Sequence, residues 1–259
     1  MELLISEVAS MSCQLTGDLG VSSDVGVILP TYREAQNIEK LIAEIENLPL
    51  NASILVIDDS SPDKTAEIVK GLQKKYDDLL LCVRPQKCGL GTAITDGFKI
   101  FLSLKISPRF IVTMDADYSH NPKAMLQLLS NMQSGCGIVI GSRYCRGGKI
   151  AGWPHTRKII SRAANIVAKS VVGLKLNDCT SGFRCYSTHF LKEAIGSLHS
   201  QTYEIQIETV KQALLRGFGI KEVPILFVNR KRGKSKLTSA EIQSYISYIF
   251  KTVTHARNR

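Results

Sequence analysis

The stretch Phe110-Ile111-Val112-Thr113-Met114-Asp115-Ala116-Asp117 decides the fold expected for this chain of 259 residues. Five mostly apolar residues lead directly into two aspartates separated by one small residue, a pattern that predicts a buried parallel strand. Open α/β sheets bind their ligands at the carboxyl ends of such strands. Two carboxylates at that position suit a hard divalent cation that also holds a diphosphate. A lone pair of this kind also occurs as a simple cap or turn, so the surrounding sequence has to decide.

Apolar runs typical of buried strands recur on both sides of this stretch, at 25–29, 53–57, 79–83 and 137–140. Segments with helical spacing of apolar residues separate them, and this alternation predicts an α/β fold with a doubly wound, mostly parallel sheet flanked by helices. Right-handed crossovers place the loops after successive strands along one edge. That edge is expected to gather these polar side chains with the two aspartates: Tyr32, Glu34, Asp58, Asp59, Arg84 and Lys87.

Gly89 and Gly91 stand at the start of an expected helix, where a backbone without side chains can approach a phosphate closely. The chain lacks the G-x-G-x-x-G pattern after its first strand, which disfavours a nicotinamide dinucleotide as ligand. The expected ligand of the sheet edge is therefore a different nucleotide or phosphate compound.

Positive charge is concentrated in the rear of the chain. Residues 1–142 hold 12 Lys and Arg against 17 Asp and Glu, whereas residues 143–259 hold 21 against 6. A basic rear half predicts an anionic partner, either a nucleic acid, an anionic membrane surface or a phosphorylated substrate, or else a basic surface that only aids solubility. Its most basic segment, 230–236, is a candidate loop for closing over a diphosphate, with arginine donating two parallel hydrogen bonds.

Arg157, Ser161 and Asn165 recur at every fourth position of an expected helix and therefore share one face. That face suits a phosphate group, and an ordinary solvated face is the alternative. The seven cysteines are scattered without a C-x-x-C pair, so neither a disulfide framework nor a zinc site is expected. No apolar run approaches the ~20 residues that span a bilayer, so no transmembrane segment is expected.

Seven motifs carry a resemblance to a known family over roughly residues 25–240. They occupy residues 30–34 (PTYRE), 57–63 (IDDSSPD), 89–93 (GLGTA), 115–122 (DADYSHNP), 141–144 (GSRY), 180–184 (TSGFR) and 227–237 (FVNRKRGKSKL). With these motifs the chain resembles the dolichyl-phosphate mannose synthases, which are inverting glycosyltransferases of the GT-A fold.

The resemblance implies transfer of mannose from GDP-mannose to dolichyl or another polyprenyl phosphate, with Mg²⁺ or Mn²⁺ as cofactor. It assigns catalysis to Asp117 and Arg230, and the metal to Asp115 and Asp117. The residues that it implies for binding the nucleotide sugar are Pro30, Tyr32, Glu34, Ile57, Asp59, Lys87, Gly89, Asp115, Ala116 and Lys236. The residues that it implies for binding the acceptor phosphate are Arg143, Arg157 and Ser161.

The expected organisation combines the resemblance, which covers roughly residues 25–240, with the pattern of the two ends of the chain: residues 1–24 lack sustained periodicity, and the last segment has apolar residues at helical spacing. Residues 1–24 form a mobile extension, and residues 25–238 form the GT-A domain. Within it, 25–141 bind the nucleotide sugar and 142–238 form a basic acceptor-binding half. Residues 239–259 form an amphipathic helix that belongs to the core or lies on a membrane or partner. We expect peripheral attachment to the cytoplasmic face of a membrane (endoplasmic reticulum in a eukaryote, plasma membrane in a prokaryote), including attachment through a small membrane subunit.

The sequence departs from the family pattern at two positions, with Arg33 where asparagine is common and Ser119 where some relatives carry glutamine. Two alternatives stay open. The same fold would also serve a polyprenyl-phosphate glucosyltransferase or another lipid-directed hexosyltransferase. A non-catalytic nucleotide- or nucleic-acid-binding module would use the basic half differently, but no nucleic-acid-binding module is recognisable, and no nucleic-acid partner is expected.

Overall fold

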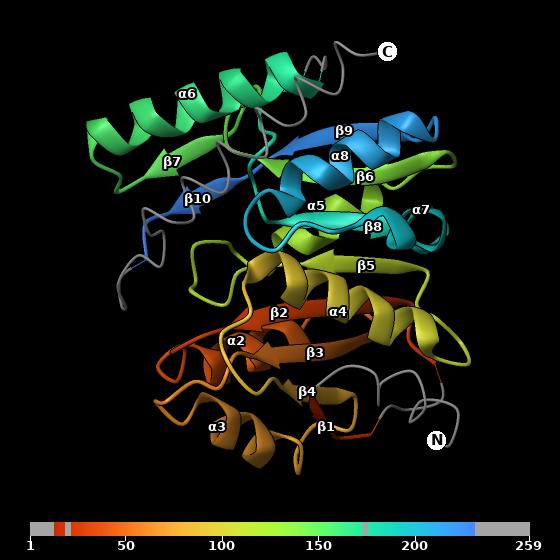
Figure 1. Ribbon diagram of the computed structural model, residues 1–259. Helices are drawn as coiled ribbons and strands as arrows, with labels where there is room; N and C mark the ends of the chain where they lie inside the picture. The colour runs from red at the N-terminus through yellow and green to blue at the C-terminus, as the bar shows by residue number, and fades with distance from the viewer. Residues whose placement is uncertain (1–12, 19–21, 173–175, 231–259) are drawn as a thin grey trace.

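The computed structural model describes residues 13–18, 22–172 and 176–230, which are built on one eight-stranded sheet (Figure 1). The strand order is β1-β4-β3-β2-β5-β8-β6-β9. These strands are β1 (Gln14–Thr16), β2 (Val25–Thr31), β3 (Ala52–Asp58), β4 (Leu79–Val83), β5 (Phe110–Thr113), β6 (Cys136–Ser142), β8 (Arg184–Ser187) and β9 (Gly219–Pro224). A separate parallel pair is formed by β7 (Lys149–Ala151) and β10 (Leu226–Val228).

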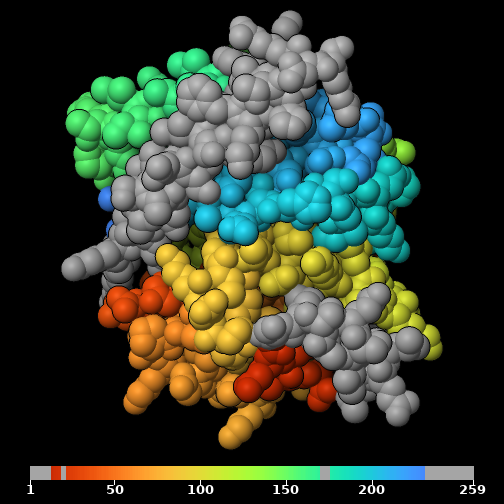
Figure 2. All heavy atoms as spheres, viewed as in Figure 1, coloured from red at the N-terminus to blue at the C-terminus, as the bar shows by residue number. Residues whose placement is uncertain are grey.

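Helices cover both faces of the sheet. They are α2 (Ile38–Glu46), α3 (Thr65–Leu72), α4 (Leu90–Ser103), α5 (Ala124–Ser130), α6 (His155–Val172), α7 (Thr188–Ala194) and α8 (Ile205–Leu215), with a 3₁₀ turn η1 at Ile195–Ser197. One apolar core lies between the sheet and α4, α7 and α8, and a second lies between the sheet and α2, α3 and α5. In the space-filling view, the yellow surface of α4 lies against the cyan and blue surface of α7 and α8 (Figure 2).

Strand β3 shows why the sheet is buried on both faces. Leu55 and Ile57 point into the first core, whereas Ile54 and Val56 point into the second, because successive side chains of a strand alternate between faces. The expected doubly wound, mostly parallel sheet is thereby confirmed. Strands β2, β3, β4 and β5 are parallel, and β6 pairs in parallel with β9.

The structure differs from the sequence prediction at several places. Strand β8 runs antiparallel between β5 and β6, where no strand was expected. Residues 14–16, expected to belong to a mobile extension, pair antiparallel with β4 at the edge of the sheet. Ser61 followed by Pro62 predicts an N-cap and a first helical position. Helix α3 begins instead at Thr65, because Lys64 has a left-handed backbone and the carboxylate of Asp63 accepts a hydrogen bond from the hydroxyl of Thr65 at 2.6 Å.

The carboxyl ends of the parallel strands meet at one edge, as expected. Asp58, at the end of β3, lies beside Thr31 of β2 and Val83 of β4. The pair β7–β10 joins the same edge, because the backbone N–H of Val228 donates to the carbonyl of Ser119 at 3.0 Å. The division at residues 141/142 stays a prediction, and the helix expected at 239–259 lies outside the described residues.

Candidate active site

A cavity opens at this edge of the sheet. It brings together eight of the ten residues expected to bind a nucleotide sugar, and the two expected catalytic residues. Its lining consists of Pro30, Thr31, Tyr32, Glu34, Ile57, Asp59, Lys87, Leu90, Ala93, Asp115, Ala116, Asp117, Tyr203 and Arg230. Gly89 is not in this lining, and Lys236 lies outside the described residues. The functional roles of the residues stay predictions, but their gathering around one cavity is observed.

The carboxylate of Asp117 is fixed by its neighbours. The backbone N–H of Ser119 donates to Oδ1 at 3.0 Å, the Ser119 hydroxyl donates to the same oxygen, and Arg230 Nη2 lies 3.1 Å from Oδ2. Tyr118 between them has a φ of 61°, a left-handed turn that brings Ser119 back toward Asp117. Burial pushes the pKa of Asp117 upward, but Ser119 and Arg230 outweigh burial, so the pKa lies below its ordinary value. Asp117 is therefore held as an anion.

Arg84 organises the loop that faces the expected nucleotide; the sequence placed it at this edge but assigned it no binding role. Its Nε donates to Asp59 at 2.6 Å, its Nη1 donates to Thr92 at 2.7 Å and its Nη2 donates to the Gly89 carbonyl at 3.0 Å. Burial raises the pKa of Asp59, and the charge of Arg84 opposes that shift. The position of Arg84 directly after β4, at the ligand edge of the sheet, was the available signal in the sequence.

The two glycines at the start of α4 accommodate the protein's own backbone. A Cβ on Gly89 would lie 2.4 Å from the carbonyl oxygen of Gln201, and one on Gly91 would lie 2.4 Å from that of Ser200. The N–H of Gly91 donates to the Gln201 carbonyl at 2.9 Å. The close approach at Gly89 and Gly91 is therefore made by the loop before α8, and binding of a phosphate at these glycines stays a prediction.

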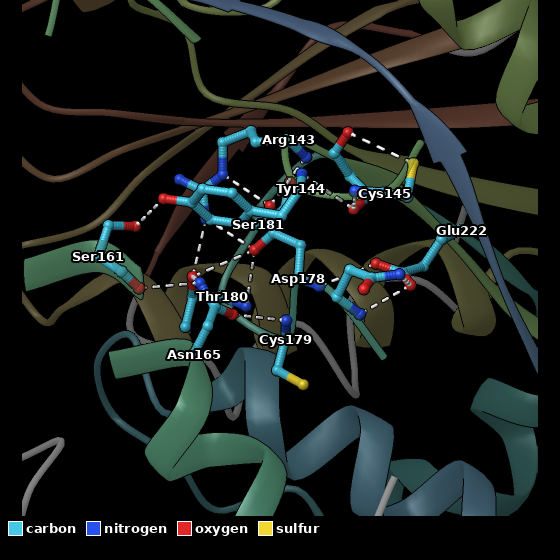
Figure 3. A network of polar contacts seen from close by, with 12 residues as sticks. Arg143, Tyr144, Cys145, Ser161, Asn165, Asp178, Cys179, Thr180, Ser181 and Glu222 are labelled. Carbon is cyan, nitrogen blue, oxygen red and sulfur yellow. Dashed lines mark hydrogen bonds and ion pairs between the residues drawn. The ribbon is translucent and has the colours of Figure 1, made fainter. Parts of the chain in front are cut away.

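Arg143 of the expected acceptor site is buried in an ion pair. Its Nε and Nη2 each donate to the carboxylate of Asp178 at 2.7 Å, and Nη2 also donates to Thr180 at 2.7 Å (Figure 3). Glu222 of β9 fixes the same loop by accepting the backbone N–H of Asp178 at 2.8 Å. Arg143 thus joins the end of β6 to the loop before β8, a structural task that the sequence did not reveal.

The face of α6 that carries Arg157, Ser161 and Asn165 points toward these loops, in agreement with their spacing. Ser161 accepts the hydroxyl of Tyr144 at 2.8 Å. Asn165 accepts the backbone N–H of Cys179 at 2.8 Å and donates to Thr180 (Figure 3). Arg157, one turn before Ser161, donates from Nη1 to the side chain of Asn229 at 3.1 Å.

The guanidinium groups of Arg143, Arg157 and Arg230 gather beside the carboxylates of Asp115 and Asp117. Burial and the like charges of Arg230 and Arg143 lower the pKa of Arg157, and the charge of Asp117 opposes that shift without cancelling it. His120 lies among the same groups, packed against the rings of Phe183 and Phe227 at 5.0 and 5.1 Å. Its burial lowers the pKa of His120 to about 4, so it adds no positive charge at neutral pH. Arg143 and Arg230 are each paired with a carboxylate, so Arg157 is the member of this group without an ion pair among the described residues.

The comparisons with known proteins agree with this geometry. The family model described as glycosyl transferase family 2 matches residues 26–205, and the chain belongs to this family of enzymes. It is 34% identical over 219 residues to a polyprenol monophosphomannose synthase of Mycolicibacterium smegmatis, covering 84% of this chain and 82% of that protein. It is 36% identical over 233 residues to a dolichol-phosphate mannosyltransferase of Pyrococcus furiosus, covering 88% of this chain and 63%, under two thirds, of that protein.

Solved structures share the fold at lower sequence identity. A glucosyl-3-phosphoglycerate synthase from Mycobacterium tuberculosis, crystallised with Mn²⁺, UDP and glucosyl-3-phosphoglycerate, aligns with a TM-score of 0.62 at 18% identity, over 90% of this chain and 79% of that one. A mannosyltransferase from Pyrobaculum calidifontis, crystallised with GDP-mannose and Mn²⁺, aligns with a TM-score of 0.59 at 14% identity, over 95% and 69%. Both likenesses support the α/β fold of this chain.

Proposed function

We propose that the protein transfers mannose from GDP-mannose to dolichyl or another polyprenyl phosphate, with inversion at the anomeric carbon. One observation carries this proposal: Asp117 and Arg230 meet at 3.1 Å in the wall of the cavity, beside the guanidinium groups of Arg143 and Arg157. Both relatives named above are mannose transferases by name, for a polyprenol or dolichol phosphate acceptor.

The donor would bind along the cavity, with its nucleoside near Asp59 and its diphosphate near Asp115 and Asp117. Among the residues that the structure describes, no group of three or more His, Cys, Asp or Glu side chains is placed to hold a metal ion. Two carboxylates nevertheless fit Mg²⁺ or Mn²⁺, since such ions are commonly held by one or two carboxylates and complete their coordination with substrate phosphates and water. When bound, the ion would neutralise charge on the departing diphosphate.

The acceptor phosphate would bind at Arg157, with Arg143 and Ser161 on the same side of the cavity. One of its oxygens forms the new bond to the anomeric carbon while the bond from that carbon to the diphosphate oxygen breaks, releasing GDP. The attacking oxygen is already anionic at neutral pH, so the reaction requires no general base. Arg230 would stabilise the charge that develops on the leaving diphosphate, a type of contact whose loss costs on the order of 10²–10³ in rate for oxyanion donors.

Helix α6 gives the proposed enzyme a surface for a membrane that carries its acceptor. Ile159, Ile160 and Ile166 are 67%, 64% and 64% exposed, and Arg162 stands among them. None of the helices within residues 13–18, 22–172 and 176–230 is long and apolar enough to cross a membrane. Apolar side chains flanked by basic ones suit peripheral contact with an anionic lipid surface. Attachment through α6 to the cytoplasmic face, directly or with a small membrane subunit, is part of the proposal.

The test uses purified protein, labelled GDP-mannose and dolichyl phosphate in detergent, with Mg²⁺, Mn²⁺ or a chelator. Lipid-extractable label that requires the ion and disappears in Asp117→Ala supports the proposal. Label that forms equally well with chelator removes the metal role. Competition by unlabelled UDP-glucose and UDP-N-acetylglucosamine decides the sugar, because a glucosyltransferase of the same fold would prefer UDP-glucose. Absence of lipid product with every donor refutes the proposed function.

A further inference from the structure

Arg157 differs from the other two guanidinium groups of the site in its contacts. Arg143 is paired with Asp178, and Arg230 is paired with Asp117. Arg157 makes no ion pair with any described residue; its contacts are the amide oxygen of Asn229 at 3.1 Å and the ring of Trp153, whose centroid lies 4.3 Å from its Cζ. Two neutral groups therefore hold this cation, and no carboxylate of the described residues forms an ion pair with it, although the charge of Asp117 acts on it from beyond ion-pair distance.

Trp153, the single tryptophan of the chain, is placed firmly enough to act as a support. It is 8% exposed, and its ring packs edge-on against Phe227 of β10 at 5.0 Å. Gly152 before it has a φ of 74°, a left-handed conformation that turns the chain between β7 and α6. A guanidinium over an indole face gains about 0.5–2 kcal/mol, depending on how far the pair is desolvated. The ring thus favours one location of the Arg157 guanidinium.

Asn229 fixes the other side of Arg157 and connects it to the carboxylate pair. Its backbone N–H donates to Ala151 at 2.9 Å and its side-chain N–H donates to Gly152 at 3.1 Å, which leaves its Oδ1 to accept from Arg157. The next residue, Arg230, contacts Asp117. Arg157 is consequently held on the same short segment that reaches the proposed reaction centre.

We propose that Trp153 and Asn229 are positioning residues that hold the guanidinium of Arg157 toward the phosphate of the acceptor while leaving its charge available. This inference rests on the proposed function. Repulsion from Arg143 and Arg230 would otherwise favour a solvent-directed Arg157 side chain, and each substrate molecule would have to order it again. A carboxylate in place of Asn229 would still accept the hydrogen bond from Arg157 but would neutralise the cation, and it would lose the hydrogen bond donated to the Gly152 carbonyl.

The test compares Trp153→Leu, Trp153→Phe and Asn229→Asp by steady-state kinetics with dolichyl phosphate and GDP-mannose. We expect Trp153→Leu and Asn229→Asp each to raise the KM for dolichyl phosphate about tenfold, while the KM for GDP-mannose changes less than about twofold. Trp153→Phe, which keeps an aromatic face, should recover most of the loss. Phe218→Leu, an aromatic truncation against Phe190 outside the cavity lining, serves as the matched control and should change neither KM.

A purely structural role would not give this pattern. Equal changes in both KM values, or an Asn229→Asp enzyme with an unchanged KM for dolichyl phosphate, would overturn the inference. Thermal unfolding of each variant shows whether it is folded; if Trp153→Leu is not folded, Asn229→Asp and Trp153→Phe decide the matter.

A second readout separates this inference from the proposed function. If the wild-type protein makes no lipid product, the proposed function fails, and the anion site is tested alone through the fluorescence of Trp153 during titration with farnesyl phosphate or farnesol. A saturable change with the phosphate only, lost in Arg157→Gln, supports the positioning of Arg157 for a prenyl phosphate. The same response to both compounds, or no response, contradicts it.

Discussion

Replacing Asp178 with alanine removes the carboxylate that neutralises Arg143 inside the protein. Asp178 is fully buried and accepts from Nε, Nη2 and the backbone N–H of Arg143 at 2.7, 2.7 and 3.0 Å. Breaking a buried pair by removing one partner costs about 3–5 kcal/mol, because the other charge stays buried without compensation. For a chain of this size that loss corresponds to a decrease in Tm of roughly 10 °C.

The assay is reversible urea unfolding followed by circular dichroism, with thermal unfolding alongside. Glu193→Gln is the matched control, since it removes one partner of the exposed pair His189–Glu193 and should change stability by less than about 0.5 kcal/mol. Combining Arg143→Met with Asp178→Leu should recover much of the loss, because neither charge then remains buried alone. A decrease below about 1 kcal/mol for Asp178→Ala would refute the reasoning, because it would mean that Arg143 does not depend on this carboxylate.

The same pair predicts an acid dependence of stability. Burial alone would raise the pKa of Asp178, but Arg143 outweighs burial and holds that pKa below its ordinary value of 3.8. A carboxyl group with a depressed pKa stabilises the folded state above its ordinary pKa, and this stabilisation is lost as the pH falls through its folded-state pKa. The stability difference between wild type and Asp178→Asn should therefore be constant at neutral pH and shrink below about pH 4. A difference that grows on acidification would contradict the assigned direction.

Three further predictions concern the nucleotide side of the molecule. Arg33 has a φ of 60°, a left-handed conformation that asparagine tolerates better than arginine. Arg33→Asn should therefore raise the free energy of unfolding by about 0.5–1 kcal/mol in urea titrations. A lower free energy of unfolding would argue against backbone strain at this position. Gly91→Ala would bring a Cβ to 2.4 Å from the Ser200 carbonyl oxygen and should destabilise the protein by about 1–3 kcal/mol. Gly71→Ala in α3 is the control, since a Cβ there meets open space, and this variant should not lose stability. Arg84→Lys should weaken GDP binding about tenfold in calorimetry, since lysine cannot hold Asp59, Thr92 and the Gly89 carbonyl together. An unchanged affinity for GDP would show that other groups position this loop.

The sequence predicted the sheet because its central strands are apolar on both faces, a signal that does not depend on distant residues. It missed β8 because this strand has four residues, begins with an arginine and follows a polar loop. Arg184 of β8 is nevertheless fully buried, since its guanidinium donates to the carbonyls of Ser181, Gln206 and Cys179. These hydrogen-bond acceptors come from separate parts of the chain, so the local periodicity of the sequence does not predict them.

The candidate site was predictable to a similar degree. The cavity residues follow strands whose carboxyl ends necessarily meet at one edge, so their gathering could be inferred from strand positions alone. What the sequence could not provide is the choice of partner for each charge. The ion pair of Arg143 and the loop that packs on Gly89 depend on residues contributed by the rear half, and this choice decides which charges remain available.

The partners of the three arginines imply different consequences for their replacement. Arg143 is neutralised by a fully buried carboxylate, so its loss should appear first as lower stability. Arg230 is paired with Asp117, a carboxylate that also lines the cavity. A diphosphate or a cation bound there would compete for one member of this ion pair, so replacing Arg230 should affect ligand binding as well as stability. Arg157 is in contact with neutral groups and forms no ion pair with a described residue, and the charges of Arg230 and Arg143 outweigh that of Asp117 there, so Arg157 gains most from an anion. Replacing Arg157 should therefore weaken acceptor binding and should lower stability less than replacing Arg143 or Arg230 does. This ranking of the three arginines follows from how the charge of each one is compensated in the folded protein.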